Sequence, residues 1–555
     1  MSTKHLIYMP LGGAGEIGMN CYVYGYGPKG RERYILVDVG VTFPDMDGSP
    51  GVDLIFPDVQ WISDRADRLD AIFITHAHED HVGAIGHLWH RLRAPVYCRA
   101  FTALHAKRKM EEQGQNPENI NVVGAWPETT KAGDFKVGFV PISHSIPESS
   151  ALVIDTPEGR IVHTGDFKLD HSPVVGEAFD PKLYADIAKD GVLALVCDST
   201  NVFSGHAGRS EATVGPEITK LISSQKGMVV ATTFASNVAR VKTLAEAGIA
   251  AGRSVCLLGR AMQRMVAASM ESGVLSEFPH TVSVEEARDI PRQSLMLIVT
   301  GSQGERRAAS AQLARGKYLG LSMDDGDTFL FSSKVIPGNE RGVIRIINAY
   351  SEMGVDVVDD NDGMYHVSGH ANRPDLLEMQ NIVNPQIVVP MHGEHRHLRE
   401  HTKLAAQAGR GSVLAPNGTC ISLSGNEPKV VEYVETGRTY LDGSVLIGAL
   451  DGVVRDRIRM ALNGHVIVTL IMDENDDPLG DPWVEIMGLP EIGRSGSPVV
   501  DVIEADLAQA VNRAANKVLL DDAKLDDMLS KTARQSANNE IGRKPEVTVV
   551  VSRLS

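Results

Sequence analysis

The chain has 555 residues, of which 43% are apolar and 23% are charged, and its formal net charge at pH 7 is −17. This length exceeds what one hydrophobic core normally organises, so we expect several domains. The charge excludes a uniformly positive surface, but it leaves open a basic groove for a polyanion on an acidic body.

The first part of the chain, residues 1–210, is rich in short β-like runs separated by turn residues. These runs are 6–9, 34–38, 71–75, 135–140, 151–155, 160–163 and 193–197. Polar residues cluster at the ends of the runs, where loops held by rigid β-structure commonly carry binding sites.

From residue 211 to residue 374 the pattern changes to an alternation of strand, turn and helix, with strands at 228–234, 255–258, 295–300 and 328–331. Such alternation predicts a small parallel sheet covered by helices. The first pattern returns after residue 375. We therefore expect residues 211–374 to be inserted into a domain formed by residues 1–210 and 375–450.

A third region follows a linker that we expect at residues 451–463. Strands at 466–472 and 545–551 flank helical stretches at 504–520 and 523–534. We therefore expect residues 464–555 to form a small C-terminal α/β domain.

Four metal-binding side chains, His76, His78, Asp80 and His81, lie within six residues directly after the strand-like run 71–75. His76 and His78 are two apart, so their rings face the same side of an extended segment. Polar groups this crowded cost desolvation and mutual repulsion unless a cation compensates. The cluster therefore predicts a metal site.

Further ligands follow other strand-like runs. His144, Asp166 and His392 each lie just beyond such a run, so all three are expected at the same sheet edge. A pair of metals about 3.5–4 Å apart needs several histidine and carboxylate ligands, and the chain can supply them. For any lone histidine, ordinary hydrogen bonding remains the alternative.

The pattern His-x-His-x-Asp-His, with these downstream residues, resembles the metallo-β-lactamase superfamily. The resemblance implies an αββα sandwich, Asp38 as support behind the ligands, and Asp166 as a bridge between two metals. The implied ligands are His76, His78, His144 and Asp166 for one metal, and Asp80, His81, Asp166 and His392 for the other. These ligand types suit two Zn²⁺ or two Mn²⁺ ions alike.

The block between Asp166 and His392 resembles an inserted β-CASP nuclease domain, and a histidine at the last ligand position is the form of RNA-acting members. Over most of its length the chain is similar to the ribonuclease J family. The motifs that carry this similarity are 11–20, 75–83, 144–147, 301–305 and 332–340. One departure, Arg306-Arg307, alters the expected turn after residue 305 and leaves its effect on RNA binding open.

The resemblance also implies roles in catalysis and substrate binding. His370 would donate a proton to the leaving oxygen, Asp198 would orient His370, and we count Asp80 with them as catalytic. A turn histidine and a strand-end carboxylate bound to backbone amides are the alternatives for His370 and Asp198. The segment expected to hold a substrate phosphate consists of His366, Val367, Ser368, Gly369 and His370.

Other positions leave two interpretations open. Ser236-Asn237 and Ser302 could bind phosphates at helix N-termini or simply cap those helices. The residues Arg240, Arg260, Arg264, Arg306 and Arg307 could line a basic groove or form a solvated face. The resemblance further implies a structural Ca²⁺ where Asp442 approaches the loop 47–53, and ordinary surface carboxylates are the alternative.

The resemblance implies a ribonuclease that acts in RNA maturation, rRNA processing and decay. We expect a 5′-to-3′ exonuclease that prefers 5′-monophosphate ends and also cuts internally. The alternatives are a small-molecule metallo-hydrolase of the glyoxalase II or β-lactamase type, and a scaffold in an RNA-processing complex.

The expected partners and location follow from the same features. We expect RNA as substrate, proteins of an RNA-degradation complex as partners, and a homodimer or homotetramer formed through the C-terminal domain. The five scattered cysteines never form a Cys-x-x-Cys pair, and no apolar run approaches the roughly 20 residues that span a bilayer. These features predict a cytoplasmic protein that is not associated with membranes.

Overall fold

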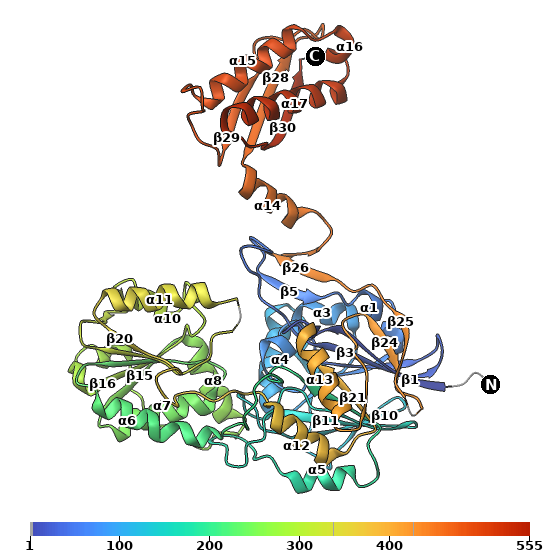
Figure 1. Ribbon diagram of the computed structural model, residues 1–555, viewed down its shortest axis with the longest axis vertical. Coiled ribbons are helices and arrows are strands. Elements are labelled where there is room, and N and C mark those ends of the chain that lie inside the picture. Colours follow the sequence, from blue (N-terminus) through green and yellow to red (C-terminus); the bar gives the residue numbers. More distant parts are fainter. Residues whose placement is uncertain (1–3, 337, 426, 555) are drawn as a thin grey trace. The chain divides into compact units, whose positions relative to one another are not determined.

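The computed structural model describes residues 4–336, 338–425 and 427–554. The chain divides into two compact units, one of Met1–Phe43 and Leu54–Thr439 and the other of Pro44–Asp53 and Tyr440–Ser555 (Figure 1). Within the described ranges, no helix is both long and apolar enough to cross a lipid bilayer.

Two β-sheets lie face to face in the first unit and share one apolar core. Tyr24 and Phe73 of the first sheet meet Phe139 and Leu152 of the second in this core. In spatial order the first sheet consists of β25 (Lys429–Tyr433), β24 (Thr419–Ser422), β1 (Lys4–Gly12), β3 (Cys21–Pro28), β4 (Arg33–Val37), β6 (Leu69–Phe73), β7 (Val96–Cys98) and β8 (Ile120–Val122). The second consists of β23 (Gly411–Ser412), β21 (Ile387–Met391), β13 (Ala194–Asp198), β12 (Gly159–His163), β11 (Ser150–Thr156), β10 (Phe135–Pro141) and β9 (Thr130–Ala132).

Helices cover the outer faces of both sheets. On the second sheet, Tyr184 of α5 (Pro181–Ala188) and Met379 of α12 (Arg373–Val383) pack against strand residues such as Val153. Along the first sheet lie α3 (Ile85–Leu92) and α4 (Ala100–Glu112). Strands such as β13 are buried on both faces, which is why they read as continuous apolar runs. The expected αββα sandwich is confirmed.

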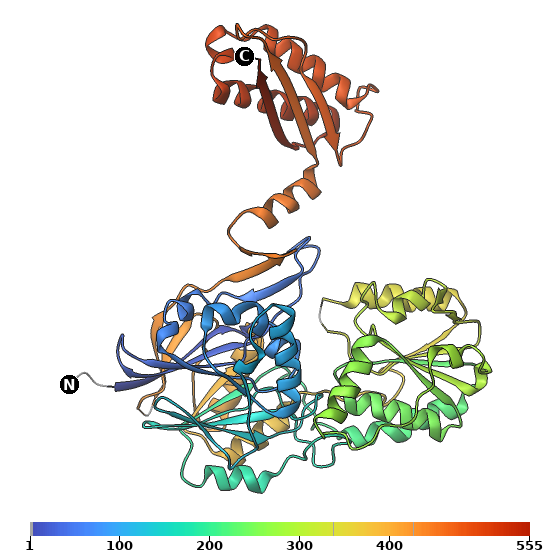
Figure 2. The ribbon, with the colours of Figure 1, turned by 180° about the vertical axis from the view of Figure 1, so that it is seen from behind.

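An α/β domain is inserted between β13 and α12. Its parallel sheet has the order β15 (Ser254–Leu258), β16 (Leu295–Val299), β14 (Val229–Thr232), β19 (Thr328–Phe331) and β20 (Asp356–Val358). On one face of this sheet pack α6 (Val214–Ser224) and α7 (Val238–Ala250), and on the other packs α11 (Glu340–Glu352). Figure 2 shows both layers.

The insertion leaves and re-enters the sandwich at neighbouring strands. The chain departs after β13 and returns through α12 to β21, which pairs with β13 in parallel so that Asp198 lies opposite Met391. Residues at the ends of these two strands are therefore close in space, although the whole inserted domain separates them in sequence.

The second unit contains a three-stranded sheet with the order β29 (Trp483–Met487), β28 (His465–Met472) and β30 (Glu546–Arg553). In β28 buried residues alternate with exposed or half-buried ones, and the buried face packs on α15 (Val499–Asn512) and α17 (Asp522–Ile541).

One expected boundary differs from the structure. Residues 453–463 form the helix α14 (Val453–Asn463) where we expected a linker. The segment is rich in Arg, Met, Ala and Leu, which favour helix even when few of the residues are buried. The first unit also ends at Thr439, earlier than the predicted residue 450.

Candidate metal centre and catalytic site

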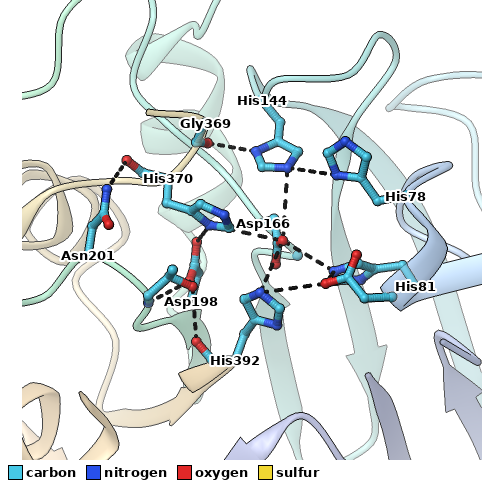
Figure 3. A network of polar contacts seen from close by, with 12 residues as sticks. His78, His81, His144, Asp166, Asp198, Asn201, Gly369, His370 and His392 are labelled. Atoms are coloured by element: carbon cyan, nitrogen blue, oxygen red, sulfur yellow. Dashed lines mark hydrogen bonds and ion pairs between the residues drawn. The ribbon is translucent and has the colours of Figure 1, made fainter. Parts of the chain in front are cut away.

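The predicted metal ligands converge at one edge of the sandwich because each lies just beyond a strand. His76 and His78 follow β6, and Asp80 and His81 lie in the short helix α2 (Glu79–Val82). The other ligands follow further strands: His144 follows β10, Asp166 follows β12 and His392 follows β21. Figure 3 shows His78, His81, His144, Asp166 and His392 pointing toward a common centre.

The predicted ligands fall into two groups, and a third group of possible ligands joins His144 and Asp166 to His370. In the first group, His78 Nδ1 lies 3.1 Å from His76 Nε2 and 3.1 Å from His144 Nε2. The second group comprises Asp80, His81, Asp166 and His392.

Asp166 lies between the two groups. Its Oδ2 atom is 3.2 Å from His81 Nε2, 3.3 Å from His392 Nε2 and 3.9 Å from His144 Nε2. Its other oxygen, Oδ1, is buried and has no hydrogen-bond partner among the described residues. A buried carboxylate oxygen without a partner costs on the order of 1–3 kcal/mol or more, and a cation would remove that cost.

Hydrogen bonds on the far side of the rings set the tautomer of the ligating histidines. In four rings Nδ1 faces a partner outside the centre: Thr75 Oγ1 for His76 at 3.0 Å, Asp38 Oδ2 for His81 at 2.7 Å, the Gly369 carbonyl for His144 at 2.6 Å, and Asn20 Oδ1 for His392 at 2.7 Å. Each ring therefore directs the lone pair of Nε2 inward. Converging lone pairs of this kind fit divalent metal ions, and Asp38 has the supporting position we expected.

Burial sets the charge of these groups. It lowers the pKa values of His76 and His144, and that of His78 to about 4, and neighbouring histidines lower those of His76 and His144 further. Burial alone would raise the pKa of Asp166, but His392 and His81 outweigh it and lower that pKa. Neutral His76, His78 and His144 beside an ionised Asp166 are protonation states that bind metals. In contrast, Asp166, Asp80 and Asp38 outweigh burial and raise the pKa of His81, whose proton a bound cation would displace.

Asp198 and His370 form a pair beside the ligands. His370 Nδ1 donates to Asp198 Oδ2 at 2.8 Å, while Asp198 Oδ1 accepts the Thr200 backbone N–H at 2.8 Å. Asp198 therefore contacts His370 through one oxygen and the backbone through the other, and its role in catalysis stays a prediction. Burial lowers the pKa of His370, but Asp198 and Asp166 outweigh it and raise it to about 9. This shift favours the protonated ring, and His370 Nδ1 lies 4.0 Å from Asp166 Oδ2.

The loop 366–370 contacts the metal ligands directly. A Cβ atom on Gly369 would lie 2.7 Å from Ser145 Oγ and 3.0 Å from His144 Cε1, so only glycine allows this approach. Ser368 Oγ accepts hydrogen bonds from Asn201 Nδ2 and from the His370 backbone N–H, and Val367 is buried in the core of the inserted domain. The loop is therefore packed tightly against the site.

A cavity of about 290 Å³ opens beside this loop. Its lining is strongly basic and polar, with Lys168, Arg209, Lys334, His366, Ser368 and His370 among its residues. Such a lining can hold a phosphate group.

Arg240 does not line a basic groove. It is fully buried, pairs with Glu211 at 2.5 Å and donates to His366 Nδ1 at 3.2 Å. Asn237 Oδ1 accepts the Arg240 backbone N–H and so caps α7, as the alternative for that residue predicted. Ser302 is also buried, whereas the side chains of Arg260, Arg264, Arg306 and Arg307 are exposed.

Asp442 is engaged in an ion pair, because its Oδ2 lies 2.7 Å from Arg457 Nη2. No group of metal-ligating side chains found among residues 4–336, 338–425 and 427–554 includes it. A structural Ca²⁺ at this position stays a prediction.

Comparison with known proteins assigns the chain to a family. Four family models match it: "Metallo-beta-lactamase superfamily" at residues 14–195, "Ribonuclease J, beta-CASP domain" at 226–350, "Zn-dependent metallo-hydrolase RNA specificity domain" at 355–416 and "Ribonuclease J C-terminal domain" at 452–554. Ribonuclease J of Sinorhizobium meliloti is 41% identical over 99% of this chain and 98% of its own length. The chain belongs to the ribonuclease J family.

Other relatives agree with this assignment. Ribonuclease J of Mycobacterium tuberculosis is 35% identical over 91% of this chain and 90% of its own length. A solved structure of a protein of unknown function from Enterococcus faecalis, 16% identical, covers 76% of this chain and all of its own with a TM-score of 0.53, which supports the fold alone. The protein is therefore a metal-dependent ribonuclease with RNA as its substrate, and the predicted enzyme class is confirmed.

Two supporting residues escaped the sequence-based assignment of roles. Thr75 Oγ1 donates to Asp38 and lies 3.0 Å from His76 Nδ1, and Asn20 contacts His392. Both lie in motifs that carried the family resemblance. Thr75 directly precedes the ligand His76, and Asn20 lies two residues after Gly18. These positions in the sequence could have indicated both residues.

Proposed function

We propose that this ribonuclease degrades RNA from the 5′ end with two divalent cations, prefers a 5′-monophosphate and also cuts internally. The observation that carries the proposal is the position of Asp166, whose Oδ2 faces both groups of ligands while His370 Nδ1 lies 4.0 Å away. His76, His78 and His144 with Asp166 would hold one ion. The other would be held by Asp80, His81, Asp166 and His392.

The side chains divide the chemistry between them. When bound, two Zn²⁺ or Mn²⁺ ions supply an activated water and neutralise charge that develops on the scissile phosphate. His370 donates its proton to the leaving 3′-oxygen. Asp198 holds the ring through the 2.8 Å bond to Nδ1, so that the proton on Nε2 is the one available for transfer.

The preference for a terminal phosphate rests on the cavity beside the loop 366–370. Lys334 and Arg209 provide positive charge there, which Asp360 offsets in part, while Lys168 is paired with Asp170 at 2.9 Å. His366 presents a neutral ring because its Nδ1 accepts from Arg240. A cavity with this lining beside His370 suits a chain end that carries a phosphate.

The C-terminal sheet supports the proposal that the protein is a homodimer or homotetramer. Its face opposite α15 and α17 carries Trp483, Met487, Ile471 and Val550, which are 44–63% exposed. Apolar side chains gathered on one open sheet face are typical of an association surface. We also propose a cytoplasmic location, because all five cysteines are buried and unpaired.

The preference for the 5′ end predicts how RNAs with different ends are cleaved. An RNA with a 5′-monophosphate should release mononucleotides at least about 10-fold faster than the same RNA with a 5′-hydroxyl, since a lost charge-assisted phosphate contact is worth about 1.5–3 kcal/mol. The measurement is product analysis with Mn²⁺ or Zn²⁺, with His392→Ala as the inactive control. Equal rates for both ends would overturn the preference.

The pKa of His370 predicts a basic limb in the pH profile of cleavage. The acid is active while protonated, so the rate should fall as the pH rises through a value no higher than about 9, because bound cations oppose protonation. Asp198→Asn should move this limb to lower pH and reduce the maximal rate about 100-fold or more. A limb that stays in place in Asp198→Asn would contradict the role of the pair.

The open sheet face predicts the behaviour of surface variants. Trp483→Lys combined with Val550→Lys should lower the molecular mass in solution to that of a smaller assembly, as measured by light scattering. Lys531→Glu, an exposed change on α17, serves as the control and should keep the wild-type mass. If both variants match the wild type, association does not use this face.

A further inference from the structure

The loop that connects β1 to β3 carries a motif, Gly12 to Asn20, of which only the contact between Asn20 and His392 has been described above. Within it, β2 (Ala14–Gly15) pairs in parallel with β22 (Gly393–Glu394), directly after the ligand His392. The N-terminal loop is therefore joined to the segment that delivers the last metal ligand.

Asn20 ends this loop and is fully buried. Its Oδ1 accepts two hydrogen bonds, from His392 Nδ1 at 2.7 Å and from the Tyr22 hydroxyl at 2.6 Å. Its Nδ2 donates to the Asp80 backbone carbonyl at 3.0 Å and lies 3.3 Å from Asp80 Oδ2. The amide thus connects two ligands that are far apart in the sequence.

The metal ligands that Asn20 contacts belong to the second group. Nδ2 also lies 3.0 Å from His81 Nε2, and the backbone N–H of Asn20 donates to the Asp80 carbonyl at 2.9 Å. Among the hydrogen bonds of the described residues, none joins the Asn20 side chain to His76, His78 or His144. A defect at Asn20 should therefore affect one site and not the other.

Two glycines make room for this amide. A Cβ atom on Gly13, whose φ is +81°, would lie 2.2 Å from Asn20 Oδ1 and 2.5 Å from the Tyr22 hydroxyl. A Cβ atom on Gly12 would lie 2.0 Å from the Met19 carbonyl. The paired glycines allow the loop to approach Asn20 closely, which gives that part of the motif a physical reason.

We propose that Asn20 is a positioning residue for the second metal ion, a role that rests on the proposed two-metal function. It keeps the proton of His392 on Nδ1, which leaves the Nε2 lone pair free for a metal. It also fixes the position of Asp80 relative to His392. His392 needs this support because it lies on a turn with a φ of +47° after β21. The Asn20 amide suits this role because it offers an acceptor for His392 and a donor for Asp80 on one planar group.

Metal titration of the full-length chain tests the proposal. Metal-free wild-type protein should bind two equivalents of Co²⁺, followed by visible absorption. Asn20→Ala should keep one equivalent at wild-type affinity and bind the other about 10–100-fold more weakly, the usual effect of losing a hydrogen bond to a ligating histidine. Ser310→Ala, which removes a buried hydroxyl in the inserted domain, should leave both affinities unchanged.

The outcomes separate the two proposals. Wild-type protein that binds one equivalent would refute the two-metal function. Two equivalents in the wild type, with both affinities unchanged or equally weakened in Asn20→Ala, would refute the role of Asn20 alone. Should Asn20→Ala fail to fold, Tyr22→Phe removes one hydrogen bond to the same oxygen. Tyr22→Phe should lower the affinity for only one of the two ions, by a smaller factor than Asn20→Ala. Equal affinities for the wild type and Tyr22→Phe would then refute the proposal.

Discussion

The buried Asp166 carboxylate is the constraint on which the rest of the site depends. One of its oxygens faces imidazole nitrogens of both ligand groups, and the other has no hydrogen-bond partner among the described residues. Burying such a charge is expensive, and without a cation only protonated imidazoles could compensate it. Bound cations would coordinate the carboxylate and relieve the repulsion between the imidazole lone pairs that point at one another. An arrangement that is unfavourable without metal therefore favours metal binding.

The fold meets this constraint by bringing strand ends from distant parts of the chain to one edge. The inserted domain departs after β13 and returns at β21, and these strands are neighbours, so Asp198 and His392 end side by side. The loop 366–370, on the way back, supplies His370 and the carbonyl that orients His144. In the proposed function, an insertion at this point would add a proton donor and a phosphate cavity to the metal centre without disturbing the sandwich.

Much of the site could be predicted from the sequence, because ligands that follow apolar strands are visible as a local pattern. His76 to His81 and the runs before His144, Asp166 and His392 indicated both the sheet edge and the ligands. The position of Arg240 could not be predicted, since its burial depends on Glu211, which lies 29 residues away along the chain. A buried ion pair and an exposed arginine look the same in a sequence. The helix α14, where we expected a linker, buries only Val454 among its side chains, so packing against other elements contributes little to it.

A crystal of the full-length protein grown with Mn²⁺, measured by anomalous scattering, tests the central claim most directly. The account predicts two peaks with Asp166 between them, one beside His76, His78 and His144 and the other beside Asp80, His81 and His392. A single peak, or two peaks that do not share Asp166, would contradict it.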